Sequence, residues 1–374
     1  DEFYFINNAD NNYLLYSNML FRIIKINDTG EIIVISNNSM TSLAFGQKKE
    51  FNDSYVNKWL NVSDEEYSGI FYNSLHDPDK YLVLSMICLD KFDSLNNADC
   101  DNISYDNYVT LLSSFDFLNV GGKDSYINNG EFFYLQNMAS DNKYWYVTDE
   151  GNSVNGNGTD IIGIRPVLTI KSGIEYVSGD GTINNPYVIE YDNALFGSYV
   201  KLDNDLWRIY KVDGDDVRMM LNDYLKVNNE PLEYIYSNVS SYHNDYNKNS
   251  IAYYLNNDYL DKLSYKDKIK EVKWPNGYYN NDNYYDYATA LNIEVDSKVG
   301  HLSIGDIRLN NNLYDYFTMT GTREKGMMIY TVSENQKMTY KSITKSMKVV
   351  PTISIDKNLL IDGDGTIDNP YVID

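Results

Sequence analysis

The stretch SGDGTINNPYVIE at residues 178–190 returns as DGDGTIDNPYVID at residues 362–374. Its Gly-Asp-Gly core predicts a tight turn, because glycine adopts positive φ without strain and aspartate hydrogen-bonds the nearby backbone. The asparagine before proline favours an extended approach, and the Tyr-Val-Ile run that follows predicts a short strand. A repeat of this length indicates that the chain consists of two copies of one unit, each closing with the same turn and strand.

The acidic residues of the second copy also suggest a calcium loop, because Asp362, Asp364 and Asp368 lie close together. An EF-hand loop, however, requires glycine at its sixth position and glutamate at its twelfth. Ile367 and Ile373 stand at those positions. The structural turn is therefore the favoured interpretation, and we expect no metal and no cofactor.

Matching segments lie in the same order upstream of the two closing stretches. Residues 20–35 and 206–221 each predict a β-hairpin, in which Phe21 and Trp207 fill equivalent core positions. Short helices are predicted next, with Trp59 and Tyr254 as core anchors at matching places. The later matches are strand-like: residues 109–113 with 299–303, 145–148 with 329–332, and 163–170 with 348–355.

These correspondences predict one repeat domain at residues 1–192 and a second at residues 193–374. Each would combine antiparallel hairpins, one or two short helices and long loops, which is an α+β architecture. Each is also long enough to bury a core of its own.

The two copies differ most at residues 88–108 and 273–297, which share no sequence. Loops that vary on a constant scaffold are where binding functions concentrate. The second of these segments is rich in aromatic residues, which offer an apolar ring and, in tyrosine and tryptophan, a polar group for contacts. We therefore take as candidate ligand-binding residues Trp274, Tyr278, Tyr279, Tyr284, Tyr285 and Tyr287.

The only two cysteines, Cys88 and Cys100, lie twelve residues apart in the first variable segment. A disulfide here would close a short loop and contribute about 3 kcal/mol in the chain-entropy model. Two free buried thiols are the alternative. In an exported, loop-rich protein the disulfide is the favoured interpretation.

Composition limits the partners of the chain. Its formal net charge is −23, which argues against nucleic-acid backbones and anionic lipid surfaces as direct partners. No apolar run approaches the 18 or so residues of a membrane-spanning helix, so we expect no membrane insertion. The chain begins at Asp1, and we expect it to be a mature or trimmed form of an exported protein.

The ordered set of motifs resembles repeat modules in large exported proteins of Firmicutes and related bacteria, for which no function is assigned. The segment Gly163–Val167 is also similar to the Gly-x-Arg-Pro strand of the C-type-lectin-like and formylglycine-generating-enzyme group. This resemblance implies a C-type-lectin-like fold for each repeat. In the second repeat Lys348 and Val350 replace Gly163 and Arg165, so an arginine that would brace the first copy is absent from the second.

We expect an acidic bacterial protein of the cell surface that binds or adheres through two lectin-like repeats and is not an enzyme. Its partner would be a glycan or protein on another surface, or further copies of the chain. One alternative is a structural subunit of an extracellular fibre, pilus or surface layer that assembles through its terminal strands. A second is a polysaccharide-active enzyme, since 54 acidic residues provide many carboxylates for such chemistry. The cysteines do not lie in a late catalytic loop like that of the formylglycine-generating enzymes, so that chemistry is not implied.

Overall fold

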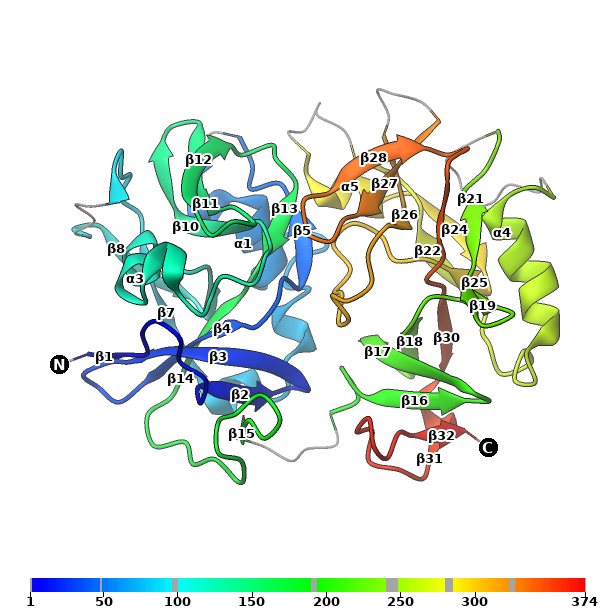
Figure 1. Ribbon diagram of the computed structural model, residues 1–374, viewed down its shortest axis with the longest axis horizontal. Coiled ribbons are helices and arrows are strands. Elements are labelled where there is room, and N and C mark those ends of the chain that lie inside the picture. Colours follow the sequence, from blue (N-terminus) through cyan, green and yellow to red (C-terminus); the bar gives the residue numbers. More distant parts are fainter. Residues whose placement is uncertain are drawn as a thin grey trace. The chain divides into compact units, whose positions relative to one another are not determined.

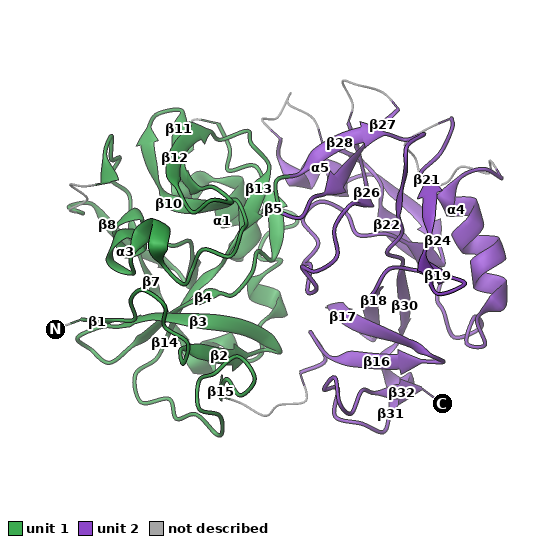
Figure 2. Ribbon diagram, viewed as in Figure 1, with its two compact units in different colours: residues 1–192, 335–337 green, residues 193–334, 338–374 purple. Residues whose placement is uncertain are grey.

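The structure is a computed structural model that describes residues 2–47, 49–95, 100–189, 194–239, 248–279, 285–322 and 327–373. Strands account for 38% of the chain and helices for 13%, which confirms a sheet-rich fold with few short helices. The chain divides into two units (Figure 2). Unit 1 comprises residues 1–192 with 335–337, and unit 2 comprises 193–334 with 338–374. No helix of the described residues is both long and apolar enough to cross a membrane.

Unit 1 contains two sheets (Figure 1). The order of the first is β15 (Tyr187–Val188), β2 (Tyr13–Tyr16), β3 (Met19–Ile26), β4 (Ile32–Ser36), β14 (Val167–Ile170) and β6 (Leu82–Val83), with β1 (Phe3–Tyr4) on β3 and β9 (Val109–Thr110) on β14. The order of the second is β12 (Ser153–Asn157), β11 (Lys143–Val147), β10 (Phe133–Ser140), β13 (Ile162–Ile164) and β5 (Thr41–Leu43). The helices are α1 (Tyr55–Leu60), α2 (Pro78–Tyr81) and α3 (Ser114–Asn119).

Unit 2 repeats this plan. Its first sheet has the order β16 (Tyr199–Leu202), β17 (Asp205–Asp213), β18 (Asp216–Leu221), β30 (Thr352–Asp356) and β25 (Val299–Gly300). Its second has the order β21 (Glu233–Ile235), β29 (Ser346–Lys348), β26 (Tyr316–Thr322), β27 (Met328–Val332) and β28 (Thr339–Ser342), with β23 (Tyr278–Tyr279) on β26. Among the described residues three small ladders join β19 (Lys226–Val227) to β20 (Glu230–Pro231), β22 (Val272–Pro275) to β24 (Glu294–Ser297) and β31 (Leu360–Ile361) to β32 (Val372–Ile373). The helices are α4 (Ile251–Tyr254) and α5 (Tyr287–Leu291).

The first sheets of the two units pair in the same register. Leu14 lies opposite Phe21 in unit 1, and Val200 lies opposite Trp207 in unit 2. A β-bulge then interrupts β3 and β17 at the same distance along each strand. Phe21 and Trp207 are both fully buried, as their matching sequence positions predicted.

The second sheets also share a parallel pair of strands at the same place. Phe133 of β10 lies opposite Gly163 of β13, and Tyr316 of β26 lies opposite Lys348 of β29. Parallel neighbours require a crossover connection rather than a tight turn. Both units make that crossover at the same point in the chain order.

Strand pairing corrects one sequence-based correspondence. Val147 lies opposite Phe133, and Val332 lies opposite Tyr316. These two valines are therefore equivalent, and the alignment of residues 145–148 with residues 329–332 was wrong by one residue. A one-residue shift moves each side chain to the other face of a strand.

Each unit packs its own apolar core. In unit 1 one buried cluster joins β3, β4, β10 and β11 and includes Ile24, Ile35, Phe117, Phe133, Leu135 and Trp145. In unit 2 a larger cluster joins both sheets to the helical segment and includes Trp207, Met219, Leu255, Phe317, Val349 and Ile353. Trp59 is fully buried as predicted. Tyr254 is only partly buried and packs against the edge of the unit 2 cluster, so it anchors the core less completely than Trp59 does.

The closing stretch of each unit forms the turn that its sequence predicted. Asp180 Oδ1 accepts hydrogen bonds from Thr182 N (3.0 Å) and Oγ1 (2.8 Å). Asp364 Oδ1 accepts the same pair from Thr366 N (3.0 Å) and Oγ1 (2.7 Å). These bonds hold the pKa of both carboxyl groups below the ordinary value, because they favour the ionised form. Both carboxylates therefore act as turn acceptors.

The turn at the end of each unit is hydrogen-bonded to a strand near its beginning, β2 in unit 1 and β16 in unit 2. Tyr13 N donates to Gly181 O in unit 1, and Tyr199 N donates to Gly365 O in unit 2, both at 2.8 Å. The strand after the turn then pairs in parallel with the same first strand, through β15 on β2 and through a bridge between Tyr371 and Val200. We call this arrangement the closing latch.

In each unit one asparagine side chain joins the helical segment to the first sheet, and we call this arrangement the asparagine clamp. Asn61 Nδ2 donates to Val109 O (2.7 Å), and Val109 N donates to Asn61 Oδ1 (3.0 Å). Asn256 makes the same two bonds to Val299, both at 2.9 Å. One side chain thus satisfies both backbone groups of a buried valine.

Replacing either clamp residue with alanine is expected to lower the free energy of unfolding of its own unit by about 2–3 kcal/mol, because a buried donor and acceptor lose their partners. Urea unfolding of N61A and N256A would measure this. N257A is the matched control, since Asn257 is exposed and bonds only a carbonyl of its own helix. Equal stability of N256A and N257A would contradict the role of the clamp.

Candidate functional site

Both variable segments leave the scaffold through a two-stranded ladder at the corresponding point of the chain. In unit 1 the ladder is β7 (Ser85–Cys88) with β8 (Ile103–Asn107), and in unit 2 it is β22 (Val272–Pro275) with β24 (Glu294–Ser297). What each ladder carries is different. Unit 1 has a disulfide-bonded loop, whereas unit 2 has β23 and α5.

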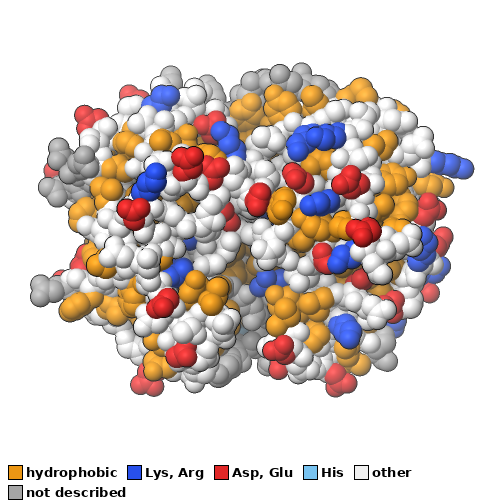
Figure 3. Space-filling view, in the orientation of Figure 1, with side chains coloured by type: hydrophobic (Ala, Val, Ile, Leu, Met, Phe, Trp, Pro, Cys, Tyr) orange, Lys and Arg blue, Asp and Glu red, His pale blue; other side chains and the backbone are white. Residues whose placement is uncertain are grey.

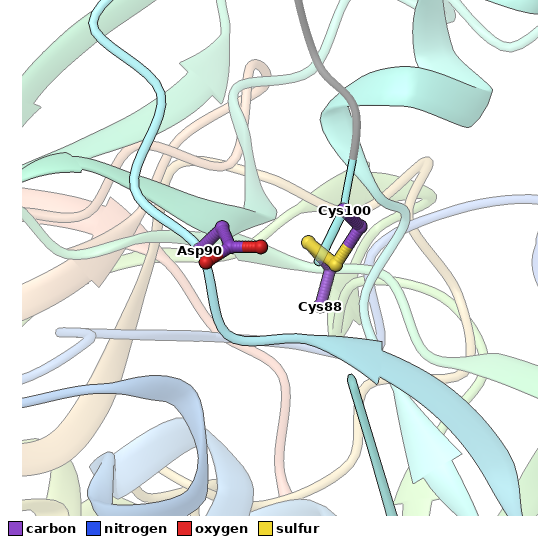
Figure 4. A group of neighbouring side chains, drawn as sticks. All are labelled: Cys88, Asp90 and Cys100. Carbon is purple, nitrogen blue, oxygen red and sulfur yellow. A yellow bond between two sulfur atoms is a disulfide. The ribbon is translucent and has the colours of Figure 1, made fainter. Parts of the chain in front are cut away.

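The unit 1 loop is tied to the scaffold at its base. Cys88 and Cys100 form a disulfide with a Cα–Cα distance of 5.8 Å (Figure 4). Cys88 N donates to Gln136 Oε1 (2.9 Å), and Asn137 Nδ2 donates to Cys88 O (3.2 Å). The buried Phe92 packs against the disulfide. The loop is therefore held by β10, which carries both amide side chains.

The carboxylate beside the disulfide does not make a metal site. Asp90 lies close to both sulfur atoms (Figure 4). Metal binding by cysteine requires a thiolate, and both sulfurs are consumed in the disulfide. Asp90 Oδ2 instead accepts hydrogen bonds from the backbone N of Asp101 (2.7 Å) and of Asn102 (2.8 Å), so it shapes the loop.

The ladder carries a group of exposed apolar side chains. Side chains alternate along a strand, and Ser85 and Ile87 point inward and are buried. The outward positions would ordinarily be polar on a solvated strand. Here the exposed apolar side chains, with their exposed fractions, are Leu84 (42%), which directly precedes β7, and Met86 (40%), Ile103 (43%) and Tyr105 (55%) of the ladder itself. We call these four residues the hairpin face.

Removing the disulfide with the double variant C88A/C100A is expected to lower the stability of unit 1 by about 3 kcal/mol, the chain-entropy value for a short loop. Urea unfolding would measure the loss. The unit 2 transition should not move, because the loop belongs to unit 1. Reductant should destabilise the parent chain and leave C88A/C100A unaffected; an effect of reductant on the variant would contradict this account.

In unit 2 the structure places three candidate ligand-binding residues in the core, where they offer no surface to a ligand. Trp274 is 1% exposed, and its Nε1 donates to Ser297 O (2.8 Å). Its indole lies against Gly300, where an added Cβ would come within 2.8 Å of the ring. The guanidinium of Arg218 covers it at 5.0 Å. Trp274 therefore fills a hollow that glycine leaves, and a threonine, as in unit 1, would close that hollow.

The other candidates divide between core and surface. Tyr279 is 1% exposed and packs edge-on against Tyr330, with ring centroids 5.6 Å apart. Tyr287 is fully buried at the start of α5. Tyr278 and Tyr285 are partly exposed. Tyr284 lies outside the described residues. Among the described candidates, only Tyr278 and Tyr285 therefore remain as candidate ligand-binding residues.

The buried carboxylate of unit 1 is occupied by the protein itself. Lys25 Nζ lies 2.9 Å from Asp116 Oδ1, which also accepts from Tyr4 Oη (2.7 Å). Ser113 Oγ donates to the second carboxylate oxygen (2.8 Å). Burial lowers the pKa of Lys25, but Asp116 and Tyr4 together more than offset this, and the net shift is upward. Asp116 is a structural ion-pair partner with no free oxygen aimed at a substrate.

The counterpart in unit 2 is Asp306, whose Oδ2 accepts from Ser303 N at 2.7 Å. Burial raises the pKa of Asp306. Elsewhere charges are spread over the surface, and Figure 3 shows acidic and basic side chains interspersed on the face it draws.

Comparisons with protein-family models, with curated proteins and with solved structures find no match for this chain.

Proposed function

We propose that this is a non-catalytic binding or adhesion protein of the bacterial cell surface, exported and built from two homologous lectin-like domains. The observation that carries the proposal is a constant scaffold with unlike insertions. The registers, bulges, closing latches and asparagine clamps recur in both units. The ladders at one point of that scaffold carry different loops. Duplicated scaffolds that vary at one loop are suited to contacting partners.

The hairpin face of unit 1 is the favoured contact surface. Leu84, Met86, Ile103 and Tyr105 are all at least 40% exposed, whereas strand residues facing water are ordinarily polar. Single exposed apolar residues need no explanation, but several on one ladder mark an interaction surface. The disulfide fixes the loop between them, which lowers the entropy lost when a partner binds. The partner is a glycan or protein on another surface.

The test is retention of the full chain on intact bacterial and host cells. The triple variant M86S/I103S/Y105S is expected to lose at least about tenfold in retention, equivalent to 1.4 kcal/mol. Its stability should change little, because all three side chains are already exposed. Retention is measured by fluorescence of the labelled chain on washed cells.

A matched control replaces equally exposed apolar residues elsewhere in unit 1, in the variant V62S/Y176S/I183S, whose side chains are 58%, 59% and 56% exposed. This control should be retained like the parent chain. Equal retention of both triple variants would remove the hairpin face from the proposal, and absence of retention of the parent chain on any surface would remove the binding function.

The alternative function is assembly into a fibre, pilus or surface layer through the terminal strands. Those strands are paired within their own units, through β1 on β3 and β32 on β31. Assembly by strand addition would therefore require these pairs to open. Electron microscopy of the concentrated chain distinguishes the alternatives: filaments would favour assembly, and separate particles would favour binding. Turnover of any member of a polysaccharide panel would instead favour an enzyme.

A further inference from the structure

Unit 2 contains a pocket of about 580 Å³ beside the turn between β16 and β17. This is within the usual size range of small-molecule sites, about 300–1,000 Å³. One wall is the turn itself, with Asn204 and Asp205, and a second is the segment after β18, with Tyr224. The third wall comes from α4 and its π-helical continuation (Leu255–Tyr259), which supply Tyr254 and Tyr259.

Below the pocket lies a group of buried polar side chains. Tyr259 lines the pocket with a side chain only 6% exposed, and its Oη is buried. Tyr265 Oη and Trp207 Nε1 are buried as well and do not line the pocket. Burial raises the pKa of both tyrosines, and the Asp205 carboxylate adds to the shift. These buried atoms are closed to a ligand, so recognition depends on the groups that face the pocket.

The acceptor that the pocket offers is Asp205. Its carboxylate is half-buried and makes no hydrogen bond or ion pair with any described residue. Burial raises the pKa of Asp205, with Asp203 and Asp223 adding to the shift. A hydroxyl group is the ligand group that suits this carboxylate, since it can donate a hydrogen bond to it.

The walls favour an uncharged ligand with flat apolar faces. Tyr254 is held by stacking on Tyr234, with ring centroids 5.2 Å apart, and its partly exposed ring forms one face. Lys226 and Lys262 line the pocket together with Asp205 and Asp223, so the lining charges balance. A strongly cationic or anionic ligand would meet like charges on one side. A pyranose ring combines apolar faces with a rim of hydroxyl groups.

We propose that this pocket is a binding site for a neutral sugar, with Asp205 accepting from ligand hydroxyls and Tyr254 packing on the ring. Unit 1 has no equivalent site, because Met19 replaces Asp205 in the strand register and is buried. The turn of unit 1 is also covered, since His76 N donates to Ser17 Oγ at 2.8 Å. This site lies in unit 2 and does not involve the hairpin face, so the two proposals fail separately.

The experiment titrates the full chain with neutral trisaccharides (maltotriose, cellotriose and N-acetylglucosamine trimer) by calorimetry and by tryptophan fluorescence, which reports on Trp207. At least one trisaccharide is expected to bind with a Kd of about 1 mM or tighter. Asp205→Asn and Tyr254→Ala should each weaken that binding at least about tenfold. Because Asp205→Asn keeps the size of the side chain, loss of binding without loss of stability would show that the carboxylate contacts the ligand.

Asp215→Asn is the matched control, because it removes the same charge from the β17–β18 turn, where Asp215 pairs with Lys357 outside the pocket. It should bind like the parent chain. The proposal is overturned if none of the three trisaccharides binds up to 10 mM, a concentration about tenfold above the expected Kd. It is also overturned if Asp205→Asn and Tyr254→Ala bind as well as Asp215→Asn.

Discussion

Replacing Arg165 with methionine is expected to destabilise unit 1 by at least about 3 kcal/mol, the loss typical when a buried charged hydrogen-bonding group is removed and its partners stay buried. The guanidinium is 1% exposed. Its Nε and Nη2 donate to Ser36 O at 3.0 and 2.8 Å, and Nη2 also reaches Asn37 O at 3.1 Å. A further bond goes to Ile127 O. One side chain thus satisfies three carbonyls of two loops.

The charge of Arg165 is retained in the folded state at neutral pH. Burial lowers the pKa of Arg165 to about 10, and the nearby Glu131 opposes that shift. Methionine has a comparable length and would fill the space above Phe133, over whose ring the guanidinium lies at 4.8 Å. The expected loss therefore reports the missing hydrogen bonds more than a cavity. Arg165→Lys should recover little, because lysine lacks the planar fork that reaches two carbonyls together.

The measurement is urea unfolding of the full chain, followed by tryptophan fluorescence. The sequence has four tryptophans, of which Trp59 and Trp145 belong to unit 1 and Trp207 and Trp274 to unit 2. Arg165→Met should lower the midpoint of the unit 1 transition alone. In unit 2 Val350 stands at the equivalent place, and Val350→Ala is a control for which only the unit 2 transition should move. A parent-like unit 1 transition in Arg165→Met would show that the brace is dispensable.

The sequence predicted those parts of the fold that depend on local backbone chemistry. The closing latch follows from glycines that need positive φ and from aspartates that bond their own turn. The hairpins follow from strand residues on either side of a turn, and this suffices to equate Phe21 with Trp207. Where two copies keep the same turn residues, the strands beside them cannot shift register without losing the turn.

The misassigned residues are those whose environment is set by distant parts of the chain. Trp274 occurs in a variable segment, and nothing local to it reveals that Gly300 leaves a hollow of its shape. Tyr254 matched Trp59 in sequence, but it lies at the edge of its core cluster, where it stacks on the partly buried Tyr234. The asparagine clamps do have a sequence signal, because Leu-Asn stands at matching places in the two helical segments, as Leu60-Asn61 and Leu255-Asn256. The pocket had none, since its lining comes from three separate segments.

The second large effect is expected from glycine to alanine substitutions in the closing latch. Gly179 has φ +95°, and a Cβ there would lie 1.9 Å from Pro186 O. Gly363 has φ +89°, and its Cβ would lie 2.4 Å from Pro370 O. Both contacts are with backbone, which cannot rotate away as a flexible side chain can. We expect each alanine to destabilise its own unit by at least about 3 kcal/mol, which exceeds the backbone strain of about 1–2 kcal/mol because of the added clash.

Gly173 and Gly214 separate the backbone strain from the steric clash. They share the positive φ (+77° and +62°) but have nothing within 4 Å of an added Cβ. Alanine at either position should cost only the backbone term, about 1 kcal/mol. Each unit therefore contains a test residue and its control, read from its own unfolding transition. The expected order of destabilisation is Gly179→Ala, then Gly363→Ala, then the two controls. If the latch variants lost no more stability than the controls, the latch would be an appendage of each unit rather than a part of its folded structure.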